Sequence, residues 1–303
     1  MKSKMFRSVA ALLLCAALLT ALSACGTSEP ASSNAPIIGP TEPTGAPTTP
    51  TDPTQPTSAP TDPTSAPTDP TVAPTQPTST PTTQAKGDDP VDPKYAGTVL
   101  QETADAGESY LSDIVFIGDS RTYGYAYYGM LPEGTKTKNV WVPANHTFSL
   151  TAHSYVNIVD ESDGQERTIV EAAKLHKPKI IIIELGINNV SYITESKFKS
   201  VYGELIQNIK AASPDTKIIC NSIYCVCRSY KKQDVINNTL IYRANGWLMD
   251  VAYENGVKYL DTVSMLKDSE GYLPEEYESG DGLHLNTKAY RAILQYIRTH
   301  AYL

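Results

Sequence analysis

The sequence predicts an α/β fold in which helices cover both faces of a parallel sheet. From about residue 110 onward, short runs rich in β-branched residues alternate with longer segments of helical periodicity. Glycine and proline mark the ends of several helical segments, since Gly256 ends one and Pro178 and Pro214 follow two others. The part of the chain that shows this alternation is long enough for one domain.

The alternation divides into predicted strands and predicted helices. The strands are short and apolar, as expected of strands that are buried on both faces, and they are predicted at residues 113–117, 139–142, 179–185, 217–223 and 257–260. The helices repeat apolar residues with helical spacing, and they are predicted at residues 168–175, 195–212, 233–254 and 287–300.

The N-terminus has the pattern of an export signal. Lys2, Lys4 and Arg7 precede an apolar stretch at residues 9–22. This stretch is too short to be read as a membrane span, and it ends in small residues. We therefore expect residues 1–25 to be a signal that directs the chain out of the cytoplasm.

The end of this signal has a further feature. Residues 22–25 read Leu-Ser-Ala-Cys and resemble the bacterial lipoprotein cleavage site, in which the cysteine becomes the lipid-modified first residue of the mature chain. We expect lipidation at Cys25, which would anchor the protein to the outer face of the cell membrane. The alternative is ordinary secretion, with Cys25 as an incidental residue.

A linker is predicted at residues 26–93. It consists mainly of Thr, Pro, Ser, Ala and Asp in imperfect repeats, and neither an aromatic residue nor Lys or Arg occurs between Cys25 and Lys86. Such a segment cannot form a core and should stay extended, reaching on the order of 190 Å as an upper bound. Its role as a passive spacer or as a carrier of O-glycans stays open. The folded domain is expected at residues 94–303.

The charge of the chain argues against nucleic acid as a partner. The net charge is −8, and the signal contains three basic and no acidic residues, so that its removal leaves −11. A protein with this acidic excess repels a phosphate backbone. The oligomeric state is not readable from the sequence.

Three cysteines remain in the mature chain besides Cys25, namely Cys220, Cys225 and Cys227. Their number is odd and their spacing is not that of a metal site. In a strand, Cys225 and Cys227 would lie on the same face, and we expect buried thiols rather than a disulfide or a zinc site.

Two short motifs indicate hydrolytic chemistry. Gly118-Asp119-Ser120 directly follows the apolar run at residues 114–117, and Asp281-x-x-His284 lies just before the last predicted helix. A strand that ends in a sharp turn can present a hydroxyl at the carboxyl edge of a sheet, while a late loop supplies a base and the acid that orients it. One loop can therefore place Asp281 and His284 against Ser120.

A third motif follows another predicted strand. The run at residues 179–185 leads into Gly186-Ile187-Asn188-Asn189. An Asn amide at the carboxyl end of a strand, beside a glycine that allows close approach of the backbone, is a suitable donor to a developing oxyanion.

With these three blocks the chain resembles the SGNH family of GDSL-type esterases, over roughly residues 110–303. The resemblance implies a flavodoxin-like three-layer α/β/α sandwich, and it implies no metal and no cofactor. It also implies roles for individual residues: Ser120 as nucleophile, His284 as base, Asp281 as its partner, the N–H groups of Ser120 and Asn145 with the Asn188 amide as oxyanion hole, and Gly118, Asp119 and Gly186 as supporting residues.

The chain departs from the family pattern at two points. The family has Asp where this chain has Asn189, which keeps the hydrogen-bonding capacity but loses the charge. The family also has a glycine after its second strand, and residues 140–147 contain none. Asn145 is the best match, because Asn tolerates a left-handed backbone, although the position could also be Ala144 or His146.

Aromatic residues near the nucleophile favour a saccharide substrate. Several tyrosines follow Ser120, and Trp141 lies on the next predicted strand; the tyrosines are Tyr123, Tyr125, Tyr127 and Tyr128. One interpretation is that these rings stack on sugar rings, and the other is that they pack against the sheet. We expect an esterase acting on an acylated, and most simply an O-acetylated, saccharide or another small ester. The alternatives are a lysophospholipase or thioesterase, and a catalytically silent glycan-binding module.

Overall fold

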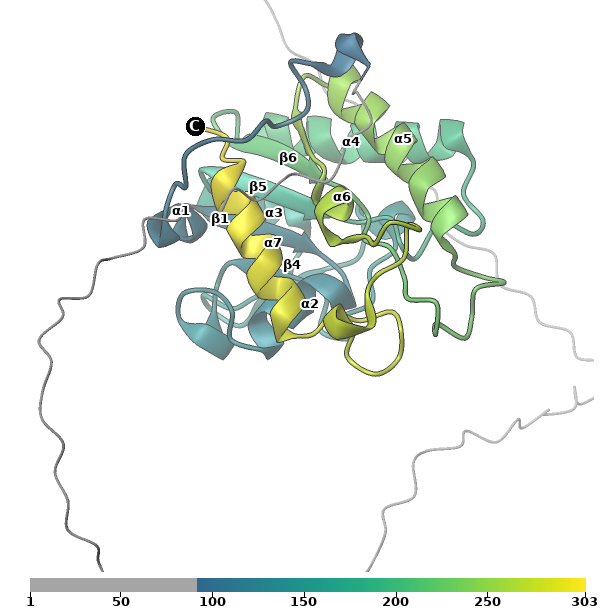
Figure 1. The fold of residues 1–303 in the computed structure, drawn as a ribbon. Coiled ribbons are helices and arrows are strands. Elements are labelled where there is room, and N and C mark those ends of the chain that lie inside the picture. The colour runs from purple at the N-terminus through teal and green to yellow at the C-terminus, as the bar shows by residue number, and fades with distance from the viewer. Residues whose placement is uncertain (1–91) are drawn as a thin grey trace, which may run out of the picture. The chain divides into compact units, whose positions relative to one another are not determined.

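A computed structural model describes residues 92–303 of the chain (Figure 1). The predicted signal at residues 1–25, the predicted lipidation at Cys25 and nearly all of the predicted linker lie outside the described residues.

The core of the domain is a parallel sheet with the strand order β2-β1-β5-β6-β7. Its strands are β1 (Ile114–Gly118), β2 (Val140–Trp141), β5 (Ile180–Glu184), β6 (Lys217–Asn221) and β7 (Lys258–Leu260). Because neighbouring strands run in the same direction, their carboxyl ends meet at one edge of the sheet. Strand β1 lies between β2 and β5, the next two strands of this sheet along the chain. This is the flavodoxin-like order, and it creates a switch point between β1 and β5.

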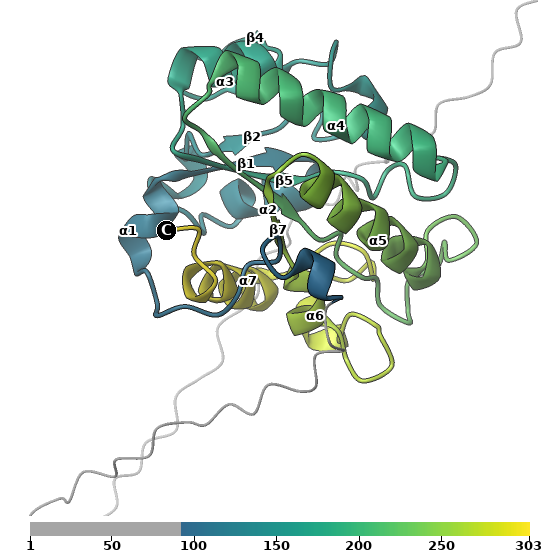
Figure 2. The same cartoon turned by 90° about the horizontal axis from the view of Figure 1, so that it is seen from above.

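Helices cover both faces of this sheet, as Figure 2 shows. One face carries α3 (Ile169–His176), α4 (Glu195–Ala212) and α5 (Asn238–Glu254). The other carries α1 (Glu108–Ser112), α2 (Ser120–Tyr127), α6 (Thr262–Leu266) and α7 (Thr287–Thr299). The predicted fold class, a three-layer α/β/α sandwich, is thereby confirmed. Among the helices of residues 92–303, none is both long and apolar enough to cross a membrane.

The apolar run of β1 is explained by burial on both faces. Ile114 and Phe116 belong to the core beneath α2 and α7, while Val115 and Ile117 belong to the core beneath α3, α4 and α5. All five residues of the strand are buried. A strand that packs on both faces has no solvent-facing position, so that its sequence shows no alternation with polar residues.

The predicted helix at residues 233–254 begins five residues later than expected. Helix α5 begins at Asn238, and the side chain of Asn237 caps it by accepting a hydrogen bond from the Leu240 N–H at 3.1 Å. Asn is a strong helix N-cap residue, and this signal was missed. Also missed were α2, α1, α6 and the hairpin formed by β3 (Ile158–Asp160) and β4 (Gln165–Arg167). Of these, α1, α6 and the two strands are too short for a clear periodicity.

The expectation of buried thiols is confirmed, since Cys220, Cys225 and Cys227 are free and buried. Burial raises the pKa of Cys225 and of Cys227 to about 11. The placement of these two on a strand was wrong: β6 ends at Asn221, and the following segment is irregular.

Gly124 sets the distance between α2 and α7. A Cβ atom at this position would lie 1.9 Å from the hydroxyl oxygen of Tyr290, which is buried on α7 and donates a hydrogen bond to the Arg121 carbonyl at 2.5 Å. The ring of Tyr290 therefore needs the space that the glycine leaves free, and the helix that begins at Ser120 is held against α7.

We predict that Gly124→Ala lowers the free energy of unfolding by about 1–3 kcal/mol, because the rigid Tyr290 ring must move to admit the methyl group. The matched control is Gly246→Ala in α5, where a Cβ atom meets nothing within 4 Å. That change should raise the stability by about 0.5–1 kcal/mol through the better helix propensity of Ala. Denaturant titration measures both changes, and equal effects at the two positions would contradict the role assigned to Tyr290.

Candidate active site

The switch point between β1 and β5 is where ligands bind in sheets of this order. Gly118 and Glu184 face each other at the ends of these two strands. The turn with Asp119 and Ser120 follows the first strand, and the segment with Asn188 follows the second. Residues 68 positions apart in the chain, Ser120 and Asn188, therefore belong to the same edge of the sheet.

The turn after β1 presents Ser120 at the start of a helix. A Cβ atom at Gly118 would lie 1.9 Å from Thr122 Oγ1, so that the turn has no room for a side chain there. Asp119 caps α2, since its Oδ1 accepts a hydrogen bond from the Arg121 N–H at 3.1 Å. Ser120 is the first residue of α2, and the N-terminal end of a helix favours negative charge on a bound group.

The loop before α7 brings two further predicted residues to Ser120. His284 Nε2 lies 2.9 Å from Ser120 Oγ, and His284 Nδ1 lies 2.6 Å from Asp281 Oδ2. The other carboxylate oxygen of Asp281 accepts hydrogen bonds from the N–H groups of Leu283 and His284, each at 2.8 Å. The carboxylate thus orients both the loop backbone and the imidazole.

The electrostatics of this loop suit a proton relay. Burial alone would raise the pKa of Asp281, but hydrogen bonds from the His284 side chain and from backbone N–H groups lower it to about 2. An ionised Asp281 accepts the Nδ1 proton and leaves Nε2 as an acceptor toward the Ser120 hydroxyl. The arrangement can therefore remove the hydroxyl proton as the oxygen attacks an electrophile.

Asn188 lies beside this relay. Its Nδ2 donates hydrogen bonds to Asp119 Oδ2 and to the Phe148 carbonyl, both at 3.1 Å. An oxyanion that takes one of these protons must displace one of the two acceptors. Gly186, two residues earlier, has φ 131°, and a Cβ atom there would lie 2.7 Å from Ile223 Cδ1, so that only glycine suits this turn.

The left-handed residue expected at Asn145 is found one position later, at His146, which has φ 56°. The side chain of Asn145 bonds within its own turn, where Oδ1 accepts the Thr147 N–H at 3.0 Å. The N–H of His146 is donated to the Pro143 carbonyl at 2.8 Å. The tetrapeptide that begins at Pro143 forms a tight turn, and this turn rather than an Asn preference decides which residue is left-handed.

Asn189 holds neighbouring segments together. It is fully buried, and its Oδ1 accepts the Leu150 N–H at 2.8 Å. Its Nδ2 donates to Ser149 Oγ at 2.8 Å and to the Tyr192 hydroxyl at 2.7 Å. Asn189 thus fixes the segment around Leu150. In the same segment, the Phe148 carbonyl accepts the hydrogen bond from the Asn188 amide.

A polar network beneath Ser120 was missed by sequence reasoning. The Glu184 carboxylate, at the end of β5, accepts hydrogen bonds from four side chains: Thr122 at 2.9 Å, Tyr125 at 3.2 Å, Asn221 at 2.9 Å and Tyr224 at 2.5 Å. Burial raises the pKa of Glu184, against the effect of these bonds. The sequence signal for this network was a charged residue, Glu184, directly after four consecutive isoleucines. The network joins the first turns of α2 to β5 and β6.

The aromatic residues near Ser120 divide into two groups. Tyr125 and Trp141 are buried and pack in the core, so that the stacking interpretation was wrong for both. Tyr123 stacks on the ring of His146, with ring centroids 3.5 Å apart, and Tyr127 is 63% exposed. Tyr123 lies in the first turn of α2, at the carboxyl edge of the sheet, whereas Tyr127 is the last residue of this helix. Tyr128 is partly buried and packs against the core.

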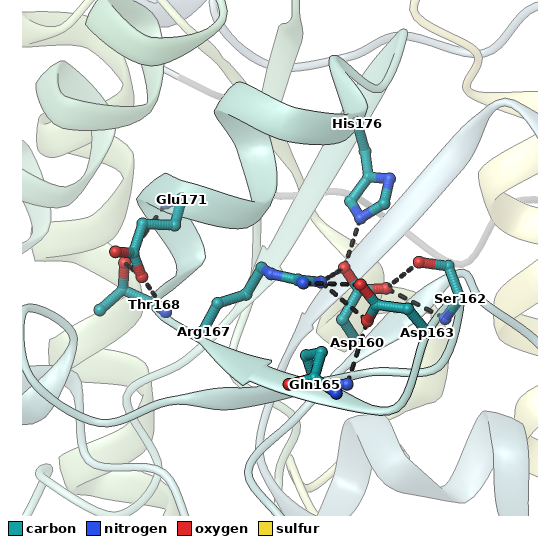
Figure 3. Close-up of polar contacts among 8 residues, drawn as sticks. All are labelled: Asp160, Ser162, Asp163, Gln165, Arg167, Thr168, Glu171 and His176. Atoms are coloured by element: carbon teal, nitrogen blue, oxygen red, sulfur yellow. Dashed lines mark hydrogen bonds and ion pairs between the residues drawn. The ribbon is translucent and has the colours of Figure 1, made fainter.

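A cavity of about 310 Å³ lies at the opposite, amino edge of the sheet. Its walls include Asp113 and Lys179, which precede β1 and β5. Figure 3 shows the charged cluster beside it, in which the buried carboxylate of Asp160 binds the side chains of Arg167 and His176. This cavity is remote from Ser120 and does not belong to the ester site. Within residues 92–303, no group of three or more His, Cys, Asp or Glu side chains could hold a metal ion.

The chain belongs to the GDSL-like Lipase/Acylhydrolase family, whose model matches residues 116–292, more than half of the chain. The resemblance to SGNH hydrolases is thereby confirmed, and the chain is a hydrolase of ester bonds. No curated protein matches it.

Solved structures of lipases and acylhydrolases are similar to the chain at low sequence identity. A GDSL-like lipase from Bacteroides thetaiotaomicron is 17% identical, with a TM-score of 0.42, and the match covers 63% of this chain and 87% of that one. A lipase/acylhydrolase from Enterococcus faecalis is 18% identical, with a TM-score of 0.41, and the match covers 61% of this chain and 94% of that one.

We predict that Asn188→Ala lowers kcat for an activated acetyl ester by about a hundredfold or more, the usual loss for one oxyanion donor, with a smaller change in KM. The matched control is Asn189→Asp, which should be far milder, because the hydroxyls of Ser149 and Tyr192 can turn to donate to a carboxylate. Steady-state kinetics with p-nitrophenyl acetate measure both. If the control were the more damaging change, the oxyanion donor would be Asn189.

Proposed function

We propose that the protein is a serine esterase that removes O-acyl groups, most simply O-acetyl groups, from carbohydrate or cell-wall glycan at the cell surface. The hydrogen-bonded line of Ser120, His284 and Asp281 at the switch point of the sheet is the observation that carries this proposal. Membership of an ester-hydrolase family supports it. A silent glycan-binding module would have no need of this relay.

The geometry supports a two-step reaction. His284 Nε2 takes the Ser120 proton as Oγ attacks the ester carbonyl, and the imidazolium is stabilised by ionised Asp281. The oxyanion would be bound by the Asn188 amide and by the N–H groups of Ser120 and of the turn that contains Asn145. The imidazolium gives its proton to the sugar oxygen as the bond between this oxygen and the acyl carbon breaks, which leaves an acyl-enzyme. Water, deprotonated by His284, then attacks the acyl carbon and releases the acid and Ser120.

The aromatic surface beside the nucleophile supports a saccharide as the alcohol part of the substrate. The stacked pair of Tyr123 and His146 and the exposed ring of Tyr127 are the groups that could stack on a sugar ring. The ring of Tyr123 belongs to the first turn of the helix that begins with Ser120.

The site of action follows from the N-terminal third of the chain. We place the enzyme outside the cytoplasm, anchored by lipid on Cys25 to the outer face of a bacterial cell membrane. The Thr/Pro-rich segment would then carry the catalytic domain away from the membrane toward an insoluble glycan.

We predict that the purified domain hydrolyses p-nitrophenyl acetate and acetylated glycan, and that its kcat/KM falls as the acyl chain lengthens to palmitoyl. The Ser120→Ala variant should lose this activity while it keeps its thermal unfolding temperature, because it lacks the nucleophile only. A higher kcat/KM for palmitoyl than for acetyl esters would favour a lysophospholipase or thioesterase. Full turnover by Ser120→Ala would contradict the assignment of Ser120 as the nucleophile.

We predict that Cys25→Ser moves the protein from the membrane fraction to the soluble fraction or leaves it as uncleaved precursor, because the change removes the lipidated thiol. The variant should hydrolyse a soluble acetyl ester as the wild type does. Cell fractionation with an antibody measures the distribution. Unchanged attachment to the membrane would show that another segment is the anchor.

A further inference from the structure

The residue that follows the nucleophile is a buried arginine with unused donors. Arg121 is 4% exposed, and its Nη1 donates a hydrogen bond to the Tyr224 carbonyl at 2.6 Å. Its Nε and Nη2 have no hydrogen-bond partner among the residues that the structure describes. Buried polar groups are normally paired, and a buried guanidinium needs both hydrogen bonds and a counter-charge. These two donors therefore call for a partner.

A small cavity next to the guanidinium can hold that partner. It measures about 10 Å³, enough for one water molecule, and it is lined by Asp119, Arg121, Glu184, Ile187, Ser222, Ile223 and Tyr224. Both residues that flank Ser120 thus border the same space. A water there can accept a hydrogen bond from the guanidinium and donate to a carboxylate or hydroxyl among the lining residues.

Asp119 is the acceptor with consequences for the site. Its two oxygens accept hydrogen bonds from the backbone N–H of Arg121 and from Asn188 Nδ2, and neither oxygen is bonded directly to the guanidinium. The charge of Asp119 is nonetheless the strongest electrostatic influence that favours the charged form of Arg121. The pair is therefore coupled across the cavity rather than in contact.

On the basis of the proposed esterase function, we propose that Arg121 is a positioning residue that acts through one bound water. The water joins the guanidinium to the Asp119 carboxylate and keeps that carboxylate charged. A charged Asp119 can only accept hydrogen bonds. It therefore holds Asn188 with Nδ2, rather than Oδ1, directed toward the carboxylate. Arg121 thus controls the orientation of the oxyanion donor without touching the substrate.

The protonation of Asp119 shows what Arg121 prevents. Burial raises the pKa of Asp119 to about 6, and the Arg121 N–H and the charges of Arg121 and His284 act against this rise. A protonated Asp119 would lose the charge that strengthens its bond from Asn188 Nδ2, so that the amide would be held mainly by the Phe148 carbonyl and its orientation would be less fixed.

Other ionisable groups face Asp119 from every side. They are Arg121 on α2, Glu184 on β5, Tyr224 after β6, His284 before α7 and Tyr290 on α7. Glu184 is the other carboxyl group that lines the cavity. Arg121 is the nearby permanent cation of this set, so that its removal should raise the pKa of Asp119.

The test compares Arg121→Met, which removes the charge, with Arg121→Lys, which retains it. In Arg121→Met the pKa of Asp119, followed by carbon-13 NMR of labelled Asp, should rise by at least about one unit, the lower end of the effect of a close opposite charge. The kcat for p-nitrophenyl acetate should then fall by roughly fivefold or more at pH 6, with KM nearly unchanged, and should recover as the pH is raised. Arg121→Lys should restore both quantities to near wild type.

Three controls separate this role from a structural one. Arg243→Met, on the exposed face of α5, should change neither quantity. In an Asp119→Asn background, Arg121→Met should no longer move the acid limb of the rate profile, because the titrating carboxyl is gone. A high-resolution crystal structure of the wild type should show a water bonded to both Arg121 and Asp119, a result that needs no variant to fold.

An unchanged pKa of Asp119 in folded Arg121→Met would overturn the proposal, as would the absence of density for the bridging water. The NMR titration and the crystal structure do not depend on turnover. If the wild type hydrolysed no acyl ester while both gave the expected results, the proposed function would fail and the coupling of Arg121 to Asp119 would stand.

Discussion

The buried carboxylate of Asp119 is the contact on which the site depends. One of its oxygens caps the helix that begins with Ser120, and the other receives the Asn188 amide from the neighbouring strand end. Ser120 and Asn188 are thus positioned by the two oxygens of one group. Burial disfavours a charge on this carboxylate, and the cation of Arg121, which lines the same small cavity, favours it.

The sheet makes this arrangement possible by separating two kinds of chemistry. Its strands are apolar and buried on both faces, which supplies rigidity, while charged and polar groups gather where the strands end. Glu184 marks the boundary, since it closes β5 and is bonded by four side chains from α2 and from β6 and the segment after it. The polar network thereby ties the nucleophile turn to the two central strands.

Several features of the fold and site could be predicted because they are local. The apolar run before Ser120 is long enough to identify a buried strand, and the three-residue spacing of Asp281 and His284 lets one loop align both. The limits of α4 agree with the predicted residues 195–212, since its apolar spacing is regular over several turns. Helix α2 was not predicted, because Gly124 and its tyrosines give it no clear helical signal.

By itself the sequence determined the fold class, the family and the identity of the candidate triad, because strand content, helical period and motif spacing are properties of short segments. Tertiary structure alone decided that Trp141 packs in the core and that Arg121 shares a cavity with Asp119. Each of these depends on contacts between segments far apart in the chain, as when the Tyr224 carbonyl holds Arg121 from 103 residues away. The energy of a buried charge is set by such neighbours, and no local pattern encodes it.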